Sequence, residues 1–242
     1  MERLILRETS TALCSTALAE NGTIISYRES ATPKAHASLT AVFIQEMLQE
    51  KGLTLSDCDG VCISMGPGSY TGLRVGVSTA KGLCFGSGKP LLAVGTLDTL
   101  VAQAAKETMI SDYRYIIPMI DARRMEVYTA VFEKKSSAAS DNCEDAFPFT
   151  QITETQPAII DGDSFAEYLE AGAVLFIGDG AGKCADVIKH PNASFMQCYP
   201  KASSMLAPAT EVYKEKRFED VAYFEPFYLK EFVATVSRKK LF

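Results

Sequence analysis

Short apolar runs separated by polar turn residues fill the opening of the chain. Three such runs occupy residues 4–6, 13–18 and 23–27. The last two flank Asn21-Gly22, a dipeptide typical of a tight β-hairpin. The spacing changes over residues 36–51, where every third or fourth position is apolar, as in an amphipathic helix: Leu39, Val42, Phe43 and Met47. The pattern predicts three antiparallel strands and then a helix.

Strands and helices alternate in the next part of the chain. The apolar run 60–65 predicts a buried strand, and Gly66-Pro67-Gly68 predicts the turn that ends it. Ser69 or Thr71 is the expected N-cap of a helix that continues to residue 83. A strand at 91–95 and a helix at 96–106 complete the first half.

The second half begins, like the first, with paired strands. The elements expected there are strands at 113–120 and 125–132, a polar loop region at 134–157 with one strand near 147–150, a helix at 164–170, a strand at 173–177, a helix from the turn at 178–180 to about 190, a strand at 195–198, a helix at 204–218 and an irregular aromatic tail at 223–232. Two successive units of this kind predict an α/β fold of two related subdomains, each a mixed sheet flanked by helices. We place the boundary near residue 100, giving units 1–100 and 101–242, with the last helix docking back on the first unit.

The helix after Gly68 carries small residues at an unusual spacing. Gly72, Gly76 and Ala80 recur every four residues and therefore share one face. Each interior Gly costs a helix roughly 0.8 to 1 kcal/mol relative to Ala. A bare helix face lets another backbone approach closely. The stripe therefore predicts a close contact, either with the chain's own sheet or with a second protein.

Composition and charge limit the classes of protein to consider. The chain has 242 residues, of which 47% are hydrophobic, and no apolar run reaches the length of a membrane helix. Its seven cysteines are scattered without a Cys-x-x-Cys pair, which favours buried thiols and a cytoplasmic protein. A net charge of −6 repels nucleic-acid phosphates, so any tRNA contact is expected to be indirect, through a basic partner.

Two turns could hold a phosphate. The first hairpin turn carries Glu8, Thr9, Ser10 and Thr11, whose hydroxyls and amides could bind a phosphate while the carboxylate orients a metal-bound water. The second turn, Gly178, Asp179 and Gly180, precedes a helix and offers an anion seat there. A polar turn and a glycine needed for chain reversal explain the same residues equally well. Together they predict at most ATP or ADP with Mg²⁺ at a degenerate or shared site.

Metal and hydrolase chemistry have weaker support. His36 and Thr40 have the spacing at which two histidines on adjacent helix turns bind a metal, but only one histidine is present. No Gly-x-Ser-x-Gly elbow occurs, and no base is identifiable for a Ser or Cys nucleophile. We therefore predict no catalytic and no metal-ligating residues.

Several motifs, taken in order along the whole chain, resemble the TsaB family, formerly YeaZ. They are ETST at 8–11, the helix opening at His36, MGPGSYTGLRVGVSTAKGL at 65–83, GTLDTL at 95–100, DARRMEVY at 121–128 and GDGA at 178–181. The resemblance implies the actin-like, ribonuclease H-like ATPase fold. It also implies a non-catalytic accessory subunit that binds and activates TsaD in threonylcarbamoyladenosine modification of tRNA, in a complex with the small ATPase TsaE.

The resemblance also implies an interface. It places residues 36–50 and 71–83 in a helix pair that packs against TsaD or, in the isolated protein, against a second copy. The residues carried over to that interface are His36, Leu39, Phe43, Gly72, Arg74, Val75, Gly76, Thr79 and Ala80. TsaD binds its metal with two histidines spaced as His36 and Thr40 are here, so Thr40 marks a lost ligand.

The chain departs from the family at Arg7, where relatives usually carry an apolar residue. A buried, unpaired cation in a strand would cost several kcal/mol. Arg7 is expected to pair with Glu8 or another carboxylate, or to lie at a wet strand end, and it weakens the case for a nucleotide at Thr9. Two other classes stay open: an ATP-dependent phosphotransferase or ATPase of the same fold, and, with less support, a metalloprotease.

Overall fold

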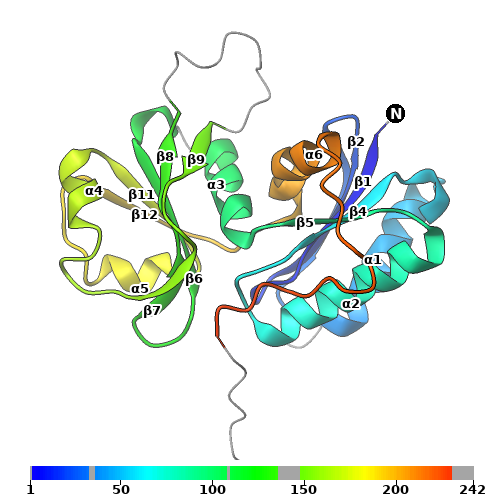
Figure 1. The fold of residues 1–242 in the computed structure, drawn as a ribbon, viewed down its shortest axis with the longest axis horizontal. Helices are drawn as coiled ribbons and strands as arrows, with labels where there is room; N and C mark the ends of the chain where they lie inside the picture. The colour runs from blue at the N-terminus through cyan, green and yellow to red at the C-terminus, as the bar shows by residue number, and fades with distance from the viewer. Residues whose placement is uncertain (1, 33–35, 108–109, 136–147, 231–242) are drawn as a thin grey trace, which may run out of the picture.

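The structure is a computed structural model that describes residues 2–32, 36–107, 110–135 and 148–230; side chains are also not described at 36–38. It contains two mixed sheets, each flanked by helices, in two units that lie side by side (Figure 1). The predicted α/β class, with two mixed sheets, is confirmed.

The first sheet has the order β3-β2-β1-β4-β5. Its strands are β1 (Arg3–Glu8), β2 (Cys14–Glu20), β3 (Thr23–Ser30), β4 (Gly60–Ser64) and β5 (Leu91–Val94). The first three pair antiparallel, and β4 and β5 add parallel strands beside β1. Helices α1 (His36–Glu50) and α2 (Tyr70–Ser87) cover one face, and the short helix η1 (Leu55–Asp57) lies between them in sequence.

The second sheet repeats this arrangement as β10-β7-β6-β11-β12, with β8 paired to β6 and β9 paired to β8. Its strands are β6 (Tyr115–Asp121), β7 (Glu126–Thr129), β8 (Phe132–Lys134), β9 (Phe149–Gln151), β10 (Gln156–Ile159), β11 (Val174–Gly178) and β12 (Ala193–Gln197). The helices of this half are α3 (Thr96–Glu107), η2 (Ile110–Asp112), α4 (Ala166–Ala171), α5 (Ala181–Ala185), η4 (Ala202–Met205) and α6 (Leu206–Lys214). Residue 100, the expected division, falls inside α3.

Several expected bounds differ from the structure for local reasons. The run 125–132 is divided between β7 and β8, because Ala130 and Val131 lie between their ladders. Strand β10 begins within the last two residues of the expected loop region and extends past it, and its exposed positions hid the alternation. Helix α5 ends at Ala185 instead of about 190, and α6 ends at Lys214 instead of 218, where Lys216 adopts a left-handed backbone.

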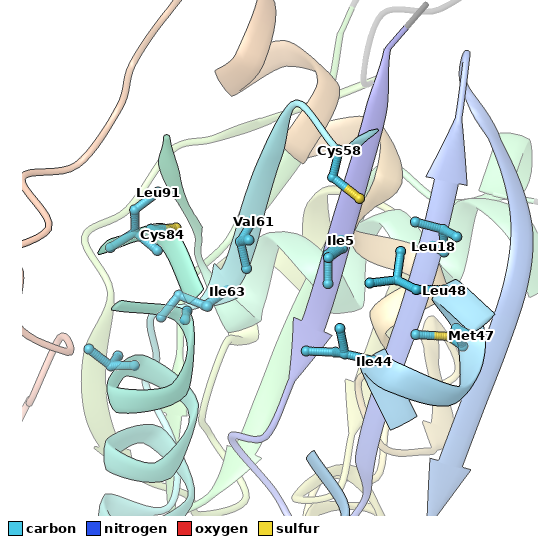
Figure 2. Packing of buried hydrophobic residues seen from close by; sticks show 12 residues of the cluster. Ile5, Leu18, Ile44, Met47, Leu48, Cys58, Val61, Ile63, Cys84 and Leu91 are labelled. Atoms are coloured by element: carbon cyan, nitrogen blue, oxygen red, sulfur yellow. The ribbon is translucent and has the colours of Figure 1, made fainter. Parts of the chain in front are cut away.

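Successive side chains of β1 point to opposite faces of the sheet, and each face packs in a separate hydrophobic core. Ile5 packs with Ile44, Met47 and Val77 of α1 and α2 (Figure 2). Leu4 and Leu6 point the other way and pack with residues of η4 and α6, such as Met205 and Ala209. Although it comes late in the chain, α6 therefore lies on the first sheet, beside β5 (Figure 1).

Candidate functional site

The turn that ends β1 lies beneath the start of α2. Glu8, Thr9, Ser10 and Thr11 are each no more than 6% exposed. The Ser69 amide, at the N-cap of α2, donates to the Ser10 carbonyl at 2.6 Å, and the Thr9 hydroxyl donates to the Gly72 carbonyl at 2.9 Å. The Thr9 hydroxyl, one of the groups that could have faced a phosphate, is thus engaged by α2, and all four residues are buried.

Glycine is required on the side of α2 that meets this turn. A Cβ at Gly72 would lie 2.0 Å from the Thr9 carbonyl oxygen, and one at Gly76 would lie 2.4 Å from the Thr9 hydroxyl oxygen. Ala80, on the same side, is fully buried in the core between the sheet and the two helices. Gly72, Gly76 and Ala80 therefore pack against their own chain, which is the first of the two kinds of contact that the stripe predicts.

The opposite side of α2 faces solvent and carries a second set of small residues. Its exposed positions are Thr71, Arg74, Ser78, Gly82, Phe85 and Gly86. A Cβ at Gly82 or at Gly86 would meet no atom within 4 Å, and the Phe85 side chain is 86% exposed. Sequence reasoning missed Ser78, Gly82 and Gly86, although they too recur every four residues. The available signal was the charged Arg74, four residues before Ser78 on the same line of the helix, in contrast to Leu73 and Val77 beside Gly72 and Gly76.

The other predicted interface residues lie on or near the outer surface of the helix pair. Arg74 is exposed and stacks over the Tyr70 ring, with 4.2 Å between the guanidinium carbon and the ring centroid. Leu39, Phe43, Val75 and Thr79 are half-buried. Helix α1 packs along α2 and exposes Val42, while the side chain of His36 lies outside the described residues. Thr40 is buried, with its hydroxyl 3.9 Å from the Cys14 sulfur.

Glu8 is a buried carboxyl group at the centre of this region. One carboxyl oxygen accepts the Ser10 amide at 2.6 Å, and the other has no hydrogen-bond partner among the described residues. Burial raises the pKa of Glu8 to about 7, against hydrogen bonds from Ser10 and Ser64 that lower it. At neutral pH the carboxyl is therefore close to half protonated.

The second predicted phosphate turn belongs to the other sheet. A Cβ at Gly178 would lie 2.2 Å from the Met119 carbonyl oxygen, so close packing accounts for this glycine. Asp179 accepts the Asp121 amide at 2.8 Å, and burial raises its pKa to about 6. The helix that starts after Gly180 has only five residues. No hydrogen bond or ion pair between described residues joins this turn to the turn at Glu8.

A segment near the end of the chain connects the two units along α2 (Figure 1). Lys81 on α2 donates to the carbonyls of Ala222 and Phe224 at 2.9 and 3.1 Å. Farther along, the Phe227 amide donates to the Met65 carbonyl at 2.8 Å, and Lys230 forms an ion pair with Glu126 of β7. This segment lies over the turn that precedes α2 and leaves the outer side of Gly82 and Gly86 open.

Two further properties concern what the site could bind. Within residues 2–32, 36–107, 110–135 and 148–230, no group of three or more His, Cys, Asp or Glu side chains is placed to hold a metal ion. Over the same residues, none of the helices combines the length and the apolar character required to cross a bilayer.

Comparison with known proteins agrees with the fold and with the motifs. A model of the TsaD family, tRNA N6-adenosine threonylcarbamoyltransferase, matches residues 28–237. The chain is 28% identical over 233 residues to the tRNA threonylcarbamoyladenosine biosynthesis protein TsaB of Escherichia coli, covering 96% of each chain. It is 30% identical over 240 residues to TsaB of Haemophilus influenzae, covering 98% of this chain and 96% of the relative.

Solved structures extend this similarity to three dimensions. YeaZ from Pseudomonas aeruginosa superposes with a TM-score of 0.78 at 25% identity, over 95% of this chain and all of that one. A second Pseudomonas aeruginosa structure, described as similar to peptidase YeaZ, gives a TM-score of 0.81 at 24% identity. With its near full-length similarity to two TsaB proteins, its duplicated fold and its motifs in the same order, this chain belongs to the TsaB (YeaZ) family of tRNA threonylcarbamoyladenosine biosynthesis proteins.

Proposed function

We propose that this chain is a non-catalytic accessory subunit that binds and activates TsaD in N6-threonylcarbamoyladenosine modification of tRNA. Family membership supports the pathway. The observation that carries the role of a docking subunit is the outer face of α2, where a Cβ at Gly82 or Gly86 would meet no atom of the described residues within 4 Å.

The energetic argument rests on what these two glycines cost. A glycine inside a helix is roughly 0.8 to 1 kcal/mol less favourable than alanine. The close contact between Gly72 and Thr9 offsets that cost, but none of the described residues makes such a contact with Gly82 or Gly86. A partner whose backbone approaches α2 closely would explain why glycine occupies these two positions, because helices pack nearest to each other where their side chains are smallest.

The surroundings of these glycines fit a protein partner. Phe85 lies between them in sequence and is 86% exposed, and large aromatic side chains are the usual anchors of interfaces. Val42 adds an exposed apolar side chain on α1. We assign this face to TsaD in the working complex and to a second copy in the isolated protein, with TsaE joining the larger assembly. The net charge of −6 supports a tRNA contact made through the partner.

Gly82→Arg tests the proposal. Open space at Gly82 lets the arginine fit the free chain, and its bulk should obstruct any helix that packs there. We expect affinity for TsaD, measured by surface plasmon resonance, to fall at least about a hundredfold, equivalent to roughly 3 kcal/mol. Modification of tRNA reconstituted with TsaD, TsaE and an adenylate donor should fall with it, while the melting temperature stays within a few degrees.

The matched control is Ala207→Arg, on the exposed surface of α6. This change adds the same side chain on a different helix and should leave binding and modification unchanged. If Gly82→Arg binds TsaD with normal affinity, the docking face is wrong. If binding fails in both variants, the effect is one of added charge and gives no support to a specific interface.

A further inference from the structure

Residues 219–230 form a strap that runs along α2 from the end of the helix towards its start (Figure 1). The Glu219 amide donates to the carbonyl of Leu91, which follows α2, at 2.8 Å. The Phe227 amide donates to the carbonyl of Met65, which precedes α2, at the same distance. The strap and the helix are therefore antiparallel neighbours.

The first part of the strap, residues 219–224, is firmly attached to the first unit. Val221 and Phe224 pack against the hydrophobic core between the sheet and the helices. The Phe224 amide donates to the Asp220 carbonyl at 2.8 Å, and the Lys81 ammonium group donates to two carbonyls of this part. Apolar burial and charge-assisted hydrogen bonds together hold it in place.

The end of the strap, residues 225–230, is held by contacts that water reaches. The Tyr228 ring stacks on the Tyr70 ring, with 4.7 Å between their centroids, and Lys230 forms an ion pair with Glu126 of β7. The side chains of Lys230 and Glu126 are 43% and 23% exposed, and exposed ion pairs stabilise a structure little. The strap end should therefore open locally while residues 219–224 stay attached.

The strap end covers the first turns of α2. Arg74 stacks over the same Tyr70 ring that Tyr228 contacts. A hydrogen bond with Tyr228 raises the pKa of Arg74, so the two side chains touch. Both residues of α2 that meet Tyr228 thus lie on one side of the helix, close to its start.

Arg74 is also the first member of the outer stripe of α2. Arg74, Ser78, Gly82 and Gly86 are exposed and recur every four residues, so they lie on one line of the helix. The strap end is in contact with Arg74 at one end of this line and leaves Gly82 and Gly86 open at the other.

We propose that the strap end, residues 225–230, is an autoinhibitory contact that competes with TsaD for the first turns of α2. The inference rests on the proposed function, in which TsaD docks at Gly82 and Gly86. A helix packed along α2 from Gly82 reaches Arg74 after about 12 Å. Closely packed helices have axes roughly 8 to 10 Å apart, which leaves no room for the Tyr228 ring between them.

The competition has a measurable size. A partner that needs the strap end open binds with an apparent Kd equal to its intrinsic Kd divided by the open fraction. A change that opens the strap end should therefore raise the affinity for TsaD by the same factor by which it raises the open population. This equality ties a measurement on the free chain to a measurement on the complex.

The first test measures opening in the free chain. Lys230→Glu turns the attraction to Glu126 into repulsion and changes no residue of α2. We expect hydrogen exchange of the Phe227 amide, followed by nuclear magnetic resonance, to accelerate roughly tenfold. The Phe224 amide, in the attached part, should exchange at an unchanged rate. Reversing the pair in Lys230→Glu with Glu126→Lys should restore slow exchange at Phe227.

Arg217→Glu is the matched control, because it makes the same change of charge in an exposed ion pair with Glu215, away from the strap end. Exchange at Phe227 and Phe224 should be unaffected by it. Equal rates at Phe227 in Lys230→Glu and in the unmodified chain, or equal acceleration at Phe224, would overturn the division of the strap into an attached part and an opening end.

The second test measures affinity for TsaD by surface plasmon resonance. Lys230→Glu should bind TsaD roughly tenfold more tightly, and the reversed pair should return to the affinity of the unmodified chain. Tyr228→Ala, which removes the ring that contacts Arg74, should also bind more tightly. Arg217→Glu should bind with unchanged affinity.

The other outcomes separate this inference from the proposed function. Unchanged affinity in Lys230→Glu and Tyr228→Ala, with normal binding by the unmodified chain, would overturn the competition alone. Weaker binding in both variants would show that the strap end belongs to the docking surface, which also overturns it. Failure of every chain to bind TsaD would overturn the proposed function, and the competition with it.

Discussion

Gly72 and Gly82 belong to the same helix, α2, but to opposite sides of it. On the inner side, a Cβ at Gly72 would come within 2.0 Å of the Thr9 backbone, so that the fold itself excludes any larger residue. On the outer side, a Cβ at Gly82 would meet no atom of the described residues within 4 Å, so the fold leaves room for a side chain there. A glycine in a helix can therefore be assigned to a close contact only when the atoms around it are known. The inner glycines are required by the packing of the chain on itself, and the outer ones are explained by the proposed protein partner.

The largest effect should follow from filling the inner side. Gly72→Ala places a methyl group against a backbone carbonyl that is fixed by the end of β1, and backbone cannot rotate away as a side chain can. We expect the free energy of unfolding, measured in urea, to fall by about 3 kcal/mol or more.

Gly76→Ala gives the comparison within the inner side. Its closest contact is the Thr9 hydroxyl, which can move, so the loss should be smaller than for Gly72→Ala. Unchanged stability in Gly72→Ala would mean that α2 is not seated on β1 as described, and the distinction between its two sides would be lost.

A smaller effect on the inner side should depend on pH. Burial raises the pKa of Glu8 from an ordinary 4.5 to about 7 in the folded chain, so the folded state holds this proton more tightly than the unfolded state. The stabilising contribution is complete below about pH 4.5 and is lost as pH rises through about 7, a change of about 3 kcal/mol. Glu8→Gln, which keeps an acceptor for the Ser10 amide, should remove most of that slope.

The measurement is urea unfolding at about 25 °C, at a series of pH values between roughly 4 and 8, for the unmodified chain and for Glu8→Gln. Asp98 and Asp179, whose pKa values burial raises to about 6, add slopes of the same sign that persist in Glu8→Gln. An identical slope in the two chains would show that Glu8 is ionised, or solvated, in the folded state.

Much of the fold could be predicted from sequence, because burying one face of a helix or strand makes apolar residues recur at a regular spacing. The fully buried strands β1, β4 and β11 were apparent as apolar runs, and α1 as a helical repeat. The elements that differed are short or exposed. Strand β10 has no buried residue to mark it, and α5 has only five residues, too few to show a helical repeat of apolar positions.

The candidate site was less predictable, since it depends on which side of α2 faces the sheet. Two stripes of small residues run along that helix, and their spacing is identical. Leu73 and Val77 flank the buried stripe, whereas the open stripe of Ser78, Gly82 and Gly86 continues the line of the exposed Arg74, and this difference of neighbours separates the two.

Arg7 was recognisable as anomalous, but its surroundings were not, because Thr16 and Ile63 come to lie beside it through strand pairing and not through sequence proximity. No ion pair between the described residues includes Arg7, and its side chain is fully buried. The carboxylate partner and the wet strand end expected from the sequence are therefore both wrong.

The smallest effect, and the one that separates the two sides most sharply, should come from Gly82→Ala combined with Gly86→Ala. On the free chain these changes remove helix-weakening residues without creating a clash, so the free energy of unfolding should rise by about 0.5 to 1 kcal/mol for each substitution. The same two methyl groups would stand between α2 and a closely packed partner helix, and affinity for TsaD should fall roughly tenfold or more. Stability and binding would then move in opposite directions, which no defect in folding can produce. A double variant that is more stable and binds TsaD at least as well would show that these glycines are not at the interface, and the reason for their presence on α2 would have to lie elsewhere.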